Sequence, residues 1–171
     1  YRCPLPQELV QPWIYRSPSG ALELFVDPTE QHGCGPSNCR LSKNGEQVWA
    51  RGVPFTLLEV LLHDDGSAAG YAYSEGLWGR GELIVAVLNP DGSERWVNRE
   101  ARGQAMPCSV SQPTVRELQP CPAGFAIELD LGFRKREWWT FGWSTGRTLG
   151  PRQLQLLGAP AMSSPVVELP V

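Results

Sequence analysis

The sequence predicts an all-β fold, an antiparallel β-sandwich or an irregular barrel built from hairpins. Two observations predict it. Turn-forming residues recur between short apolar segments along the chain. In addition, the 16 prolines and 18 glycines are spread so that few stretches of a dozen residues escape a helix breaker. With 171 residues, the chain is long enough to bury a sizeable core.

Four hairpins follow from turn residues. The apolar segments 13–16 and 21–27 are separated by Ser-Pro-Ser-Gly, which is typical of a hairpin connection. Asn44-Gly45, Asp65-Gly66 and Asp91-Gly92 each stand between further apolar segments. These dipeptides tolerate the positive φ angles of tight turns, so each predicts another pair of antiparallel strands.

Residue spacing indicates how the strands are covered. In segment 125–131, large apolar residues alternate with Ala126, Glu128 and Asp130, which predicts one buried face and one wet face. Segments 55–62 and 83–88 are nearly continuous apolar runs, which predicts central strands covered on both faces. The one place where a helical turn fits is 110–118.

No domain boundary is evident, so we expect a single all-β domain over residues 1–171. Within it, 99–124 is predicted to be a loop-rich excursion and 158–171 an extended C-terminal tail. Segments 41–49, 61–71 and 88–96 each run from apolar residues through a turn to an aromatic residue, which loosely resembles the hairpins of β-propeller blades. That resemblance implies an alternative, a small or shared set of propeller-like blades.

Charge and hydropathy exclude two classes of partner. The net charge of −3 and pI near 5.4 disfavour nucleic-acid binding, which needs clustered basic residues. The longest apolar run, 83–88, is far shorter than a bilayer-spanning helix, so no membrane span is expected. The sequence indicates no particular oligomeric state.

Cysteine placement favours an oxidising compartment. Cys34 and Cys39 flank a turn-forming insert, and Cys108 and Cys121 bracket a loop-like segment, so two local disulfides are predicted. Cys3 remains as the odd cysteine. The protein is therefore expected to be secreted, periplasmic or at the cell surface. The alternative is that all five cysteines are reduced core thiols.

Motifs that resemble catalytic or metal sites do not hold up. Segment 142–146 has the letters of a Gly-x-Ser-x-Gly nucleophile elbow around Ser144, but no histidine follows it in the chain. His63 precedes Asp64 and Asp65 at a predicted hairpin turn, where aspartate is favoured for local backbone bonding. His32, Cys34 and Cys39 offer three possible zinc ligands, but familiar closed zinc sites have a fourth. A disulfide between the two cysteines is therefore favoured over a metal site. No catalytic residue, metal ligand or cofactor is predicted.

The aromatic content is the unusual feature of the composition, because seven tryptophans is a high number for a chain of this length. On an extended strand Trp139 and Trp143 share one face and Trp138 faces the other. Trp78 lies in the glycine-rich loop 75–81. Large aromatic planes either fill the core or contact a ligand. The candidate ligand-binding residues are Trp78, Trp138, Trp139, Trp143 and Tyr73.

Three hypotheses for function follow. The first is a noncatalytic extracytoplasmic binding module that recognises carbohydrate or a protein surface through exposed aromatic rings. The second is a structural or adhesive interaction domain of a larger secreted or surface protein. The third is a hydrolase with a carboxylate pair or a Ser/His site. The first two are favoured over an enzyme.

Overall fold

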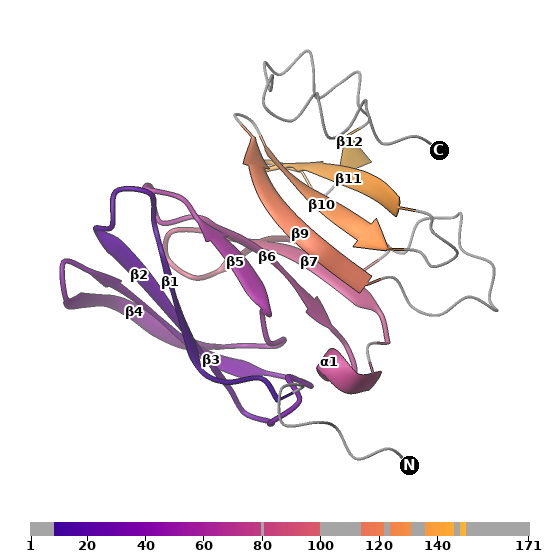
Figure 1. Ribbon diagram of the computed structural model, residues 1–171. Helices are drawn as coiled ribbons and strands as arrows, with labels where there is room; N and C mark the ends of the chain where they lie inside the picture. Colours follow the sequence, from indigo (N-terminus) through magenta and orange to yellow (C-terminus); the bar gives the residue numbers. More distant parts are fainter. Residues whose placement is uncertain are drawn as a thin grey trace. The chain divides into compact units, whose positions relative to one another are not determined.

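The computed structural model describes residues 9–79, 81–99, 114–121, 124–130, 136–145 and 148–149. They form three antiparallel four-stranded sheets (Figure 1), which confirms the predicted all-β class, and no closed barrel is found among the described strands. One helix accompanies them in this part of the chain, the single turn α1 (Gly76–Gly79). The glycine-rich loop around Trp78 therefore contains a helical turn.

The chain divides into two compact units, residues 1–100 (unit 1) and 101–171 (unit 2). The expectation of a single domain over residues 1–171 stays a prediction.

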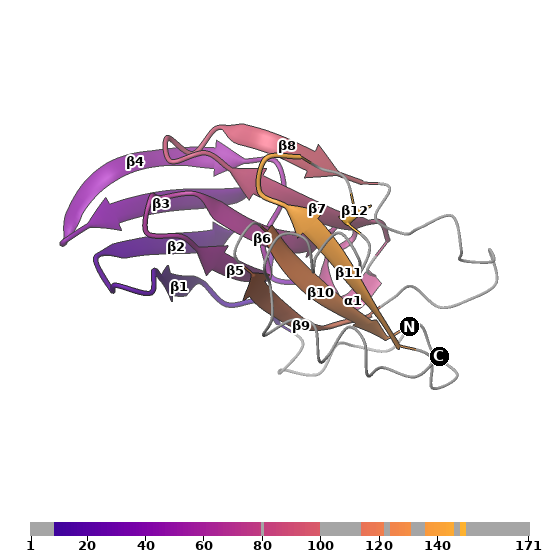
Figure 2. The same cartoon turned by 90° about the horizontal axis from the view of Figure 1, so that it is seen from above.

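Unit 1 contains two sheets in which consecutive strands are neighbours. The first sheet has the order β1-β2-β3-β4 and the second has the order β5-β6-β7-β8 (Figure 2). The strands of the first sheet are β1 (Trp13–Arg16), β2 (Leu22–Pro28), β3 (Ser37–Lys43) and β4 (Glu46–Val53). Those of the second are β5 (Glu59–Leu62), β6 (Ala68–Tyr73), β7 (Leu83–Leu88) and β8 (Glu94–Asn98).

The predicted turns connect these strands. The Ser-Pro-Ser-Gly segment joins β1 to β2, and the three Asx-Gly dipeptides join β3 to β4, β5 to β6, and β7 to β8. At the β3–β4 turn Asn44 has a φ of 50° and Gly45 a φ of 85°, the paired positive angles of the tight turn that asparagine-glycine favours. All four predicted hairpins are confirmed.

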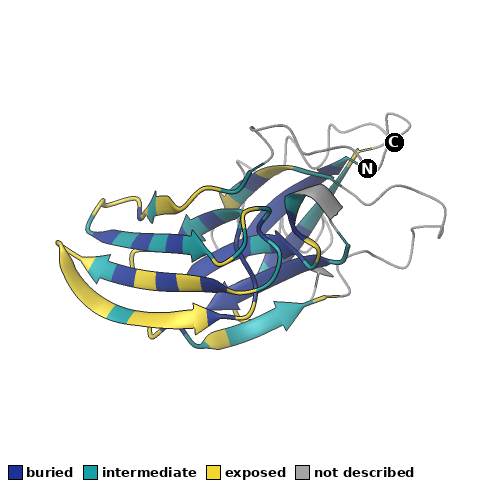
Figure 3. Ribbon diagram, turned by 90° about the horizontal axis from the view of Figure 1, so that it is seen from below, coloured by how far each residue is buried: buried dark blue, intermediate teal, exposed yellow. Residues whose placement is uncertain are grey.

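The two sheets of unit 1 pack face to face around one apolar core. Leu22, Leu24 and Val26 on β2 are buried, whereas the residues between them are partly exposed, as the alternating colours in Figure 3 show for this sheet. Ile84, Ala86 and Leu88 face them from β7 as part of the same buried cluster. Unit 1 is therefore a β-sandwich.

The two continuous apolar runs differ in their roles. Strand β7 is buried on both faces and lies inside its sheet, as predicted. Segment 55–62 is not a central strand: only Glu59–Leu62 forms β5, and it lies at a sheet edge. Phe55 and Leu57, both 2% exposed, belong to the connection that passes from the first sheet to the second. That stretch is apolar because it runs through the core.

Unit 2 holds the third sheet, with strand order β12-β11-β10-β9. The predicted helical turn at 110–118 is wrong where the structure describes it, because β9 begins at Thr114 and pairs with β10. The same strand corrects the loop-rich excursion at 99–124, of which 100–113 and 122–123 lie outside the described residues. The tail at 158–171 also lies outside them. The strands are β9 (Thr114–Cys121), β10 (Gly124–Asp130), β11 (Arg136–Gly142) and β12 (Thr148–Leu149).

Strand β10 departs from its predicted wet face. Phe125, Ile127 and Leu129 are buried as expected, but Glu128 is also buried, at 8% exposure. The carboxylate of Glu128 lies 3.6 Å from the guanidinium of Arg136, and this opposite charge compensates part of the cost of removing it from water. Both faces of β10 are therefore covered.

Candidate functional site

The candidate site is an open groove of about 610 Å³ in unit 1, at the edges where β1 and β5 end their sheets. Its walls are mostly aliphatic and aromatic, which is typical of binding sites. We call it the edge groove. The described residues that line it are Leu9, Val10, Gln11, Trp13, Tyr15, Val26, Pro28, Leu57, Leu58, Glu59, Val60, Tyr71 and Leu77.

Strand β1 turns two aromatic side chains toward the inner face of its sheet. Trp13 pairs with Val26 and Tyr15 pairs with Leu24 on β2, and paired residues share a face. Tyr15 is covered, and its hydroxyl donates a hydrogen bond of 2.9 Å to the carbonyl oxygen of Leu58 just before β5. Trp13 is 62% exposed although it lies on the core-facing side. The inner face of the first sheet is therefore left open at Trp13.

The opposite face of β1 is also apolar and exposed. Ile14 is 43% exposed and pairs with Phe25 on β2, over which the Arg40 guanidinium sits 5.2 Å from the ring centroid. Three large hydrophobic residues are exposed in the described part of the chain, and two of them, Trp13 and Ile14, are neighbours on β1. This four-residue strand consequently presents apolar surface on both sides.

The two edge strands of the first sheet differ in how well they are protected against pairing with another chain. Strand β1 keeps a regular register with β2 and has no second partner among the described strands. At the far edge, the register between β3 and β4 shifts at Leu41, and the exposed residues of β4 include Glu46 and Arg51. Bulges and charges are the usual protection of an edge strand against pairing with another chain. Strand β1 has no bulge in its pairing with β2, and its one charged residue is Arg16 at its end.

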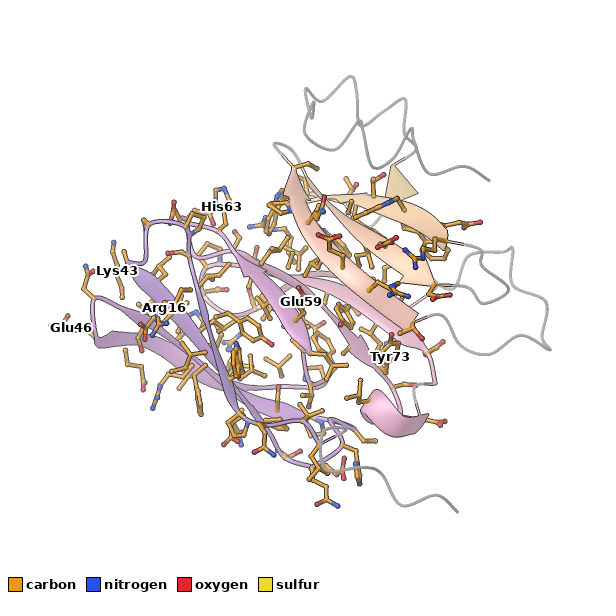
Figure 4. All side chains as sticks on the ribbon, in the orientation of Figure 1. Arg16, Lys43, Glu46, Glu59, His63 and Tyr73 are labelled. Carbon is orange, nitrogen blue, oxygen red and sulfur yellow. The ribbon has the colours of Figure 1, made fainter. Side chains whose placement is uncertain are left out.

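Burial and Glu59 together raise the pKa values of two tyrosines that line the edge groove. Glu59 begins β5, where Figure 4 labels it, and it pairs with Tyr71 on the neighbouring strand β6. Burial, and then the Glu59 carboxylate, raise the pKa of Tyr15 to about 12, and the same two causes raise the pKa of Tyr71. Both phenols are therefore neutral at physiological pH. Glu59 is the one acidic residue among the described residues that line the groove.

None of the residues predicted to bind a ligand is among the described residues that line the edge groove. Tyr73, labelled in Figure 4, is 3% exposed on β6, with its ring edge-on to that of Tyr71 at 5.9 Å. The side chain of Trp78 lies outside the description, although its backbone belongs to α1. Trp138, Trp139 and Trp143 belong to unit 2 and are half-buried. As ligand-binding residues all five stay predictions.

In unit 2 the tryptophans divide between the two faces of the sheet, as expected. Trp139 pairs with Ile127 and donates its indole N–H to Glu137 at 3.1 Å. Trp138 pairs with Glu128 on the other face, and its buried indole nitrogen has no hydrogen-bond partner among the residues that the structure describes. Trp143 packs edge-on against Phe125, with ring centroids 5.7 Å apart.

Sequence reasoning missed Trp13, Tyr15, Glu59 and Tyr71 as site residues. A signal for the first two is present in the sequence. Trp13, Ile14 and Tyr15 are consecutive large apolar residues on a short strand, and consecutive strand residues point to opposite faces. One face of such a strand must look away from the core unless both are covered. Glu59 gives no comparable signal, because its place depends on how the second sheet lies on the first.

The predicted disulfide between Cys34 and Cys39 is wrong, because both residues carry free thiols. Cys39 lies on β3 and faces the core at 2% exposure. Cys34 precedes that strand, and its thiol donates to the carbonyl oxygen of Ser74 at 3.5 Å. The two thiols therefore contact different parts of the structure and not each other. The second predicted bridge, Cys108 to Cys121, falls partly outside the described residues at Cys108.

The motifs considered for catalysis are spread over exposed turns. His63 Nδ1 lies 3.3 Å from Asp65 Oδ1 at the β5–β6 hairpin, where both side chains are more than half exposed (Figure 4). Ser144 is exposed after β11, and the glycine at 146 lies outside the described residues. No group of three or more His, Cys, Asp or Glu suited to a metal ion occurs among the residues that the structure describes.

Comparisons with protein-family models, curated proteins and solved structures give no match for this chain. Within the described ranges, the helical structure is too short to cross a lipid bilayer.

Proposed function

We propose that this chain is a noncatalytic protein-interaction module that binds an extended segment of a partner protein as an additional strand beside β1. The observation that carries the proposal is the pair of exposed neighbours Trp13 and Ile14 on an edge strand with regular register. In strand addition, main-chain hydrogen bonds supply affinity, and pockets for alternate side chains supply specificity. The edge groove offers such a pocket on the inner side of β1.

The lining of the edge groove favours a peptide over a sugar. A sugar ring needs hydrogen bonds to its hydroxyl groups as well as an aromatic plane. Of the described lining side chains, only Gln11, Glu59 and the two tyrosines carry polar groups, together with the indole N–H of Trp13. The Tyr15 hydroxyl is already used on Leu58. Aliphatic walls of this kind suit apolar side chains of a polypeptide.

Binding of blocked peptides of about seven residues, a common strand length, tests the proposal with the full chain. A peptide that alternates valine and threonine should bind, measured by fluorescence anisotropy of a label at one end. The same peptide with N-methylated backbone amides on alternate residues should bind in at most one of its two methylation patterns, because methylation removes the donors that pair with β1.

Matched variants locate the binding edge. Ile14→Lys places a charge on β1 and should abolish binding, whereas Val48→Lys makes the same change at the other edge, where Val48 is 54% exposed, and should leave binding intact. Equal loss in both variants, or binding unaffected by Ile14→Lys, would contradict strand addition at β1. Retention of an oligosaccharide by the wild type but not by Trp13→Ala, with no peptide bound, would replace the proposal with carbohydrate recognition.

A further inference from the structure

Strand β1 directs alternate backbone groups away from its sheet. The amide N–H of Ser17, just after β1, donates to the carbonyl oxygen of Leu22 at 3.0 Å, so these two residues form a hydrogen-bonded pair. Because hydrogen-bonded pairs alternate along an antiparallel ladder, the N–H and C=O groups of Ile14 and Arg16 point away from β2. No described strand pairs with β1 on that edge. The edge therefore offers two residues for main-chain pairing.

The side chains exposed on β1 are complementary to the same strand in a second copy of the chain. When two β1 strands run antiparallel around a two-fold axis at Ile14, each Ile14 lies opposite its counterpart, and each Trp13 lies opposite Tyr15 of the other copy. Aromatic and β-branched residues in such cross-strand pairs stabilise a sheet. Both large hydrophobic residues that β1 exposes, Trp13 at 62% and Ile14 at 43%, would then be covered.

The same alignment fits the free backbone groups and the charges. The two Ile14 residues exchange N–H and C=O groups, and each Arg16 N–H meets the carbonyl oxygen of Pro12 in the other copy. Proline lacks an N–H but keeps this acceptor. Antiparallel alignment places the two Arg16 side chains at opposite ends of the paired strands, whereas parallel alignment would put like charges side by side. Charge and hydrogen bonding therefore favour antiparallel pairing of two copies.

We propose that two copies of this chain associate through their β1 strands, paired antiparallel with Ile14 opposite Ile14. The first sheets of the two copies then join into one continuous sheet. The dimer covers the edge that the proposed function assigns to an extended partner segment, so its role in regulating peptide binding rests on that function. Self-pairing and peptide binding exclude each other, and dilution of the protein frees the edge for the partner.

Sedimentation equilibrium of the full chain, in the presence of a reductant, measures the association. The contact is one short strand wide, smaller than a permanent interface, so we expect half of the chains to be dimeric at about 10–100 μM. Ile14→Lys places two positive charges directly opposite each other and should leave the chain monomeric at these concentrations. Val48→Lys makes the same change on the exposed edge strand β4 and should not alter the association.

A mixture of two variants tests the register. Ile14→Lys and Ile14→Glu should each be monomeric alone and should form a dimer when combined, because opposite charges then face each other. Recovery of the dimer also shows that both variants fold. The alternating valine-threonine peptide should dissociate the wild-type dimer, because it occupies the same edge.

The outcomes separate this inference from the proposed function. A wild type that stays monomeric over the same concentration range would overturn the inference, and binding of the peptide to that monomer would leave the proposed function standing. Association that survives Ile14→Lys, or a mixture of the lysine and glutamate variants that stays monomeric, would also overturn the inference. A dimer that shows the expected response to both Ile14 variants but does not bind the peptide would support self-pairing and overturn the proposed function.

Discussion

Trp49 donates its indole N–H to the carbonyl oxygen of Pro90 at 2.9 Å, and this bond fastens the two sheets of unit 1 at one side. Trp49 lies on β4 of the first sheet, and Pro90 belongs to the turn between β7 and β8 of the second. The ring also lies against Gly92, where an added Cβ would come within 2.8 Å of ring carbons. This side of the sandwich is closed, whereas the side at β1 and β5 opens into the edge groove.

Replacement of Gly92 by alanine should destabilise unit 1. The Cβ would meet the Trp49 ring at a position whose φ is 82°, so steric conflict adds to backbone strain, and we expect a loss of about 2 kcal/mol or more. Gly45→Ala is the matched control, because its φ of 85° is similar but nothing lies within 4 Å of the added atom. Urea unfolding of both variants measures the difference. Equal losses would show that Trp49 does not press on Gly92.

Removal of the Ser37 hydroxyl should cost stability out of proportion to its size. The side chain is fully buried, and its oxygen donates a hydrogen bond of 2.8 Å to the carbonyl of Phe55, in the connection between the sheets. Ser37→Ala leaves that carbonyl without this donor, which costs about 1–3 kcal/mol. Ser42→Ala, on the outer side of the same strand, should change the free energy of unfolding by less than about 0.5 kcal/mol. A neutral Ser37→Ala would contradict the assigned bond.

Alkaline pH should weaken unit 1 through Tyr15. Burial, with a further contribution from Glu59, raises its pKa from 10.0 to about 12 in the folded chain. A raised folded pKa favours the protonated form, so this contribution to stability is complete below pH 10 and is lost as the pH rises toward 12. Tyr15→Phe should remove that part of the pH dependence, and should cost about 1 kcal/mol at neutral pH through the lost bond to Leu58. Unfolding midpoints measured from pH 8 to alkaline values, with tyrosinate absorbance beside them, test both statements.

Thiol chemistry should separate Cys34 from Cys39. Burial raises the pKa of the Cys39 thiol, against a smaller opposite effect of its hydrogen bond with Ser37, and the side chain is 2% exposed. Iodoacetamide should therefore label Cys34 in the folded protein and Cys39 only after denaturation. Peptide mapping without reductant reports both sites. A crosslinked peptide joining Cys34 to Cys39 would contradict the free thiols found here.

Local sequence signals were sufficient for the hairpins of unit 1. Asn44-Gly45 adopts the two positive φ angles that make this dipeptide a turn, and the strands on either side follow from it. The alternation on β2 and the continuous apolar run of β7 also lead directly to their burial. Each of these features depends on residues within a few positions of one another.

Long-range placement explains what local patterns missed. Segment 55–62 has the composition of a buried strand, yet Phe55 and Leu57 are buried as a connection that crosses between the sheets. Glu128 follows the alternation of a wet face but is 8% exposed, and it lies opposite Trp138 of the next strand. The edge groove needs both sheets, since Tyr15 reaches Leu58 across 43 positions of sequence. None of these partners is specified by neighbouring residues.

Each sheet of unit 1 is a meander, in which every strand pairs only with strands adjacent to it in the chain. Backbone pairing therefore requires closing only short loops, so each sheet is able to assemble from its own hairpins before the two halves meet. The step that remains is the docking of one preformed layer on the other through side chains. We expect the rate of folding to respond to substitutions in the turns, and the rate of unfolding to those that weaken the contact between layers.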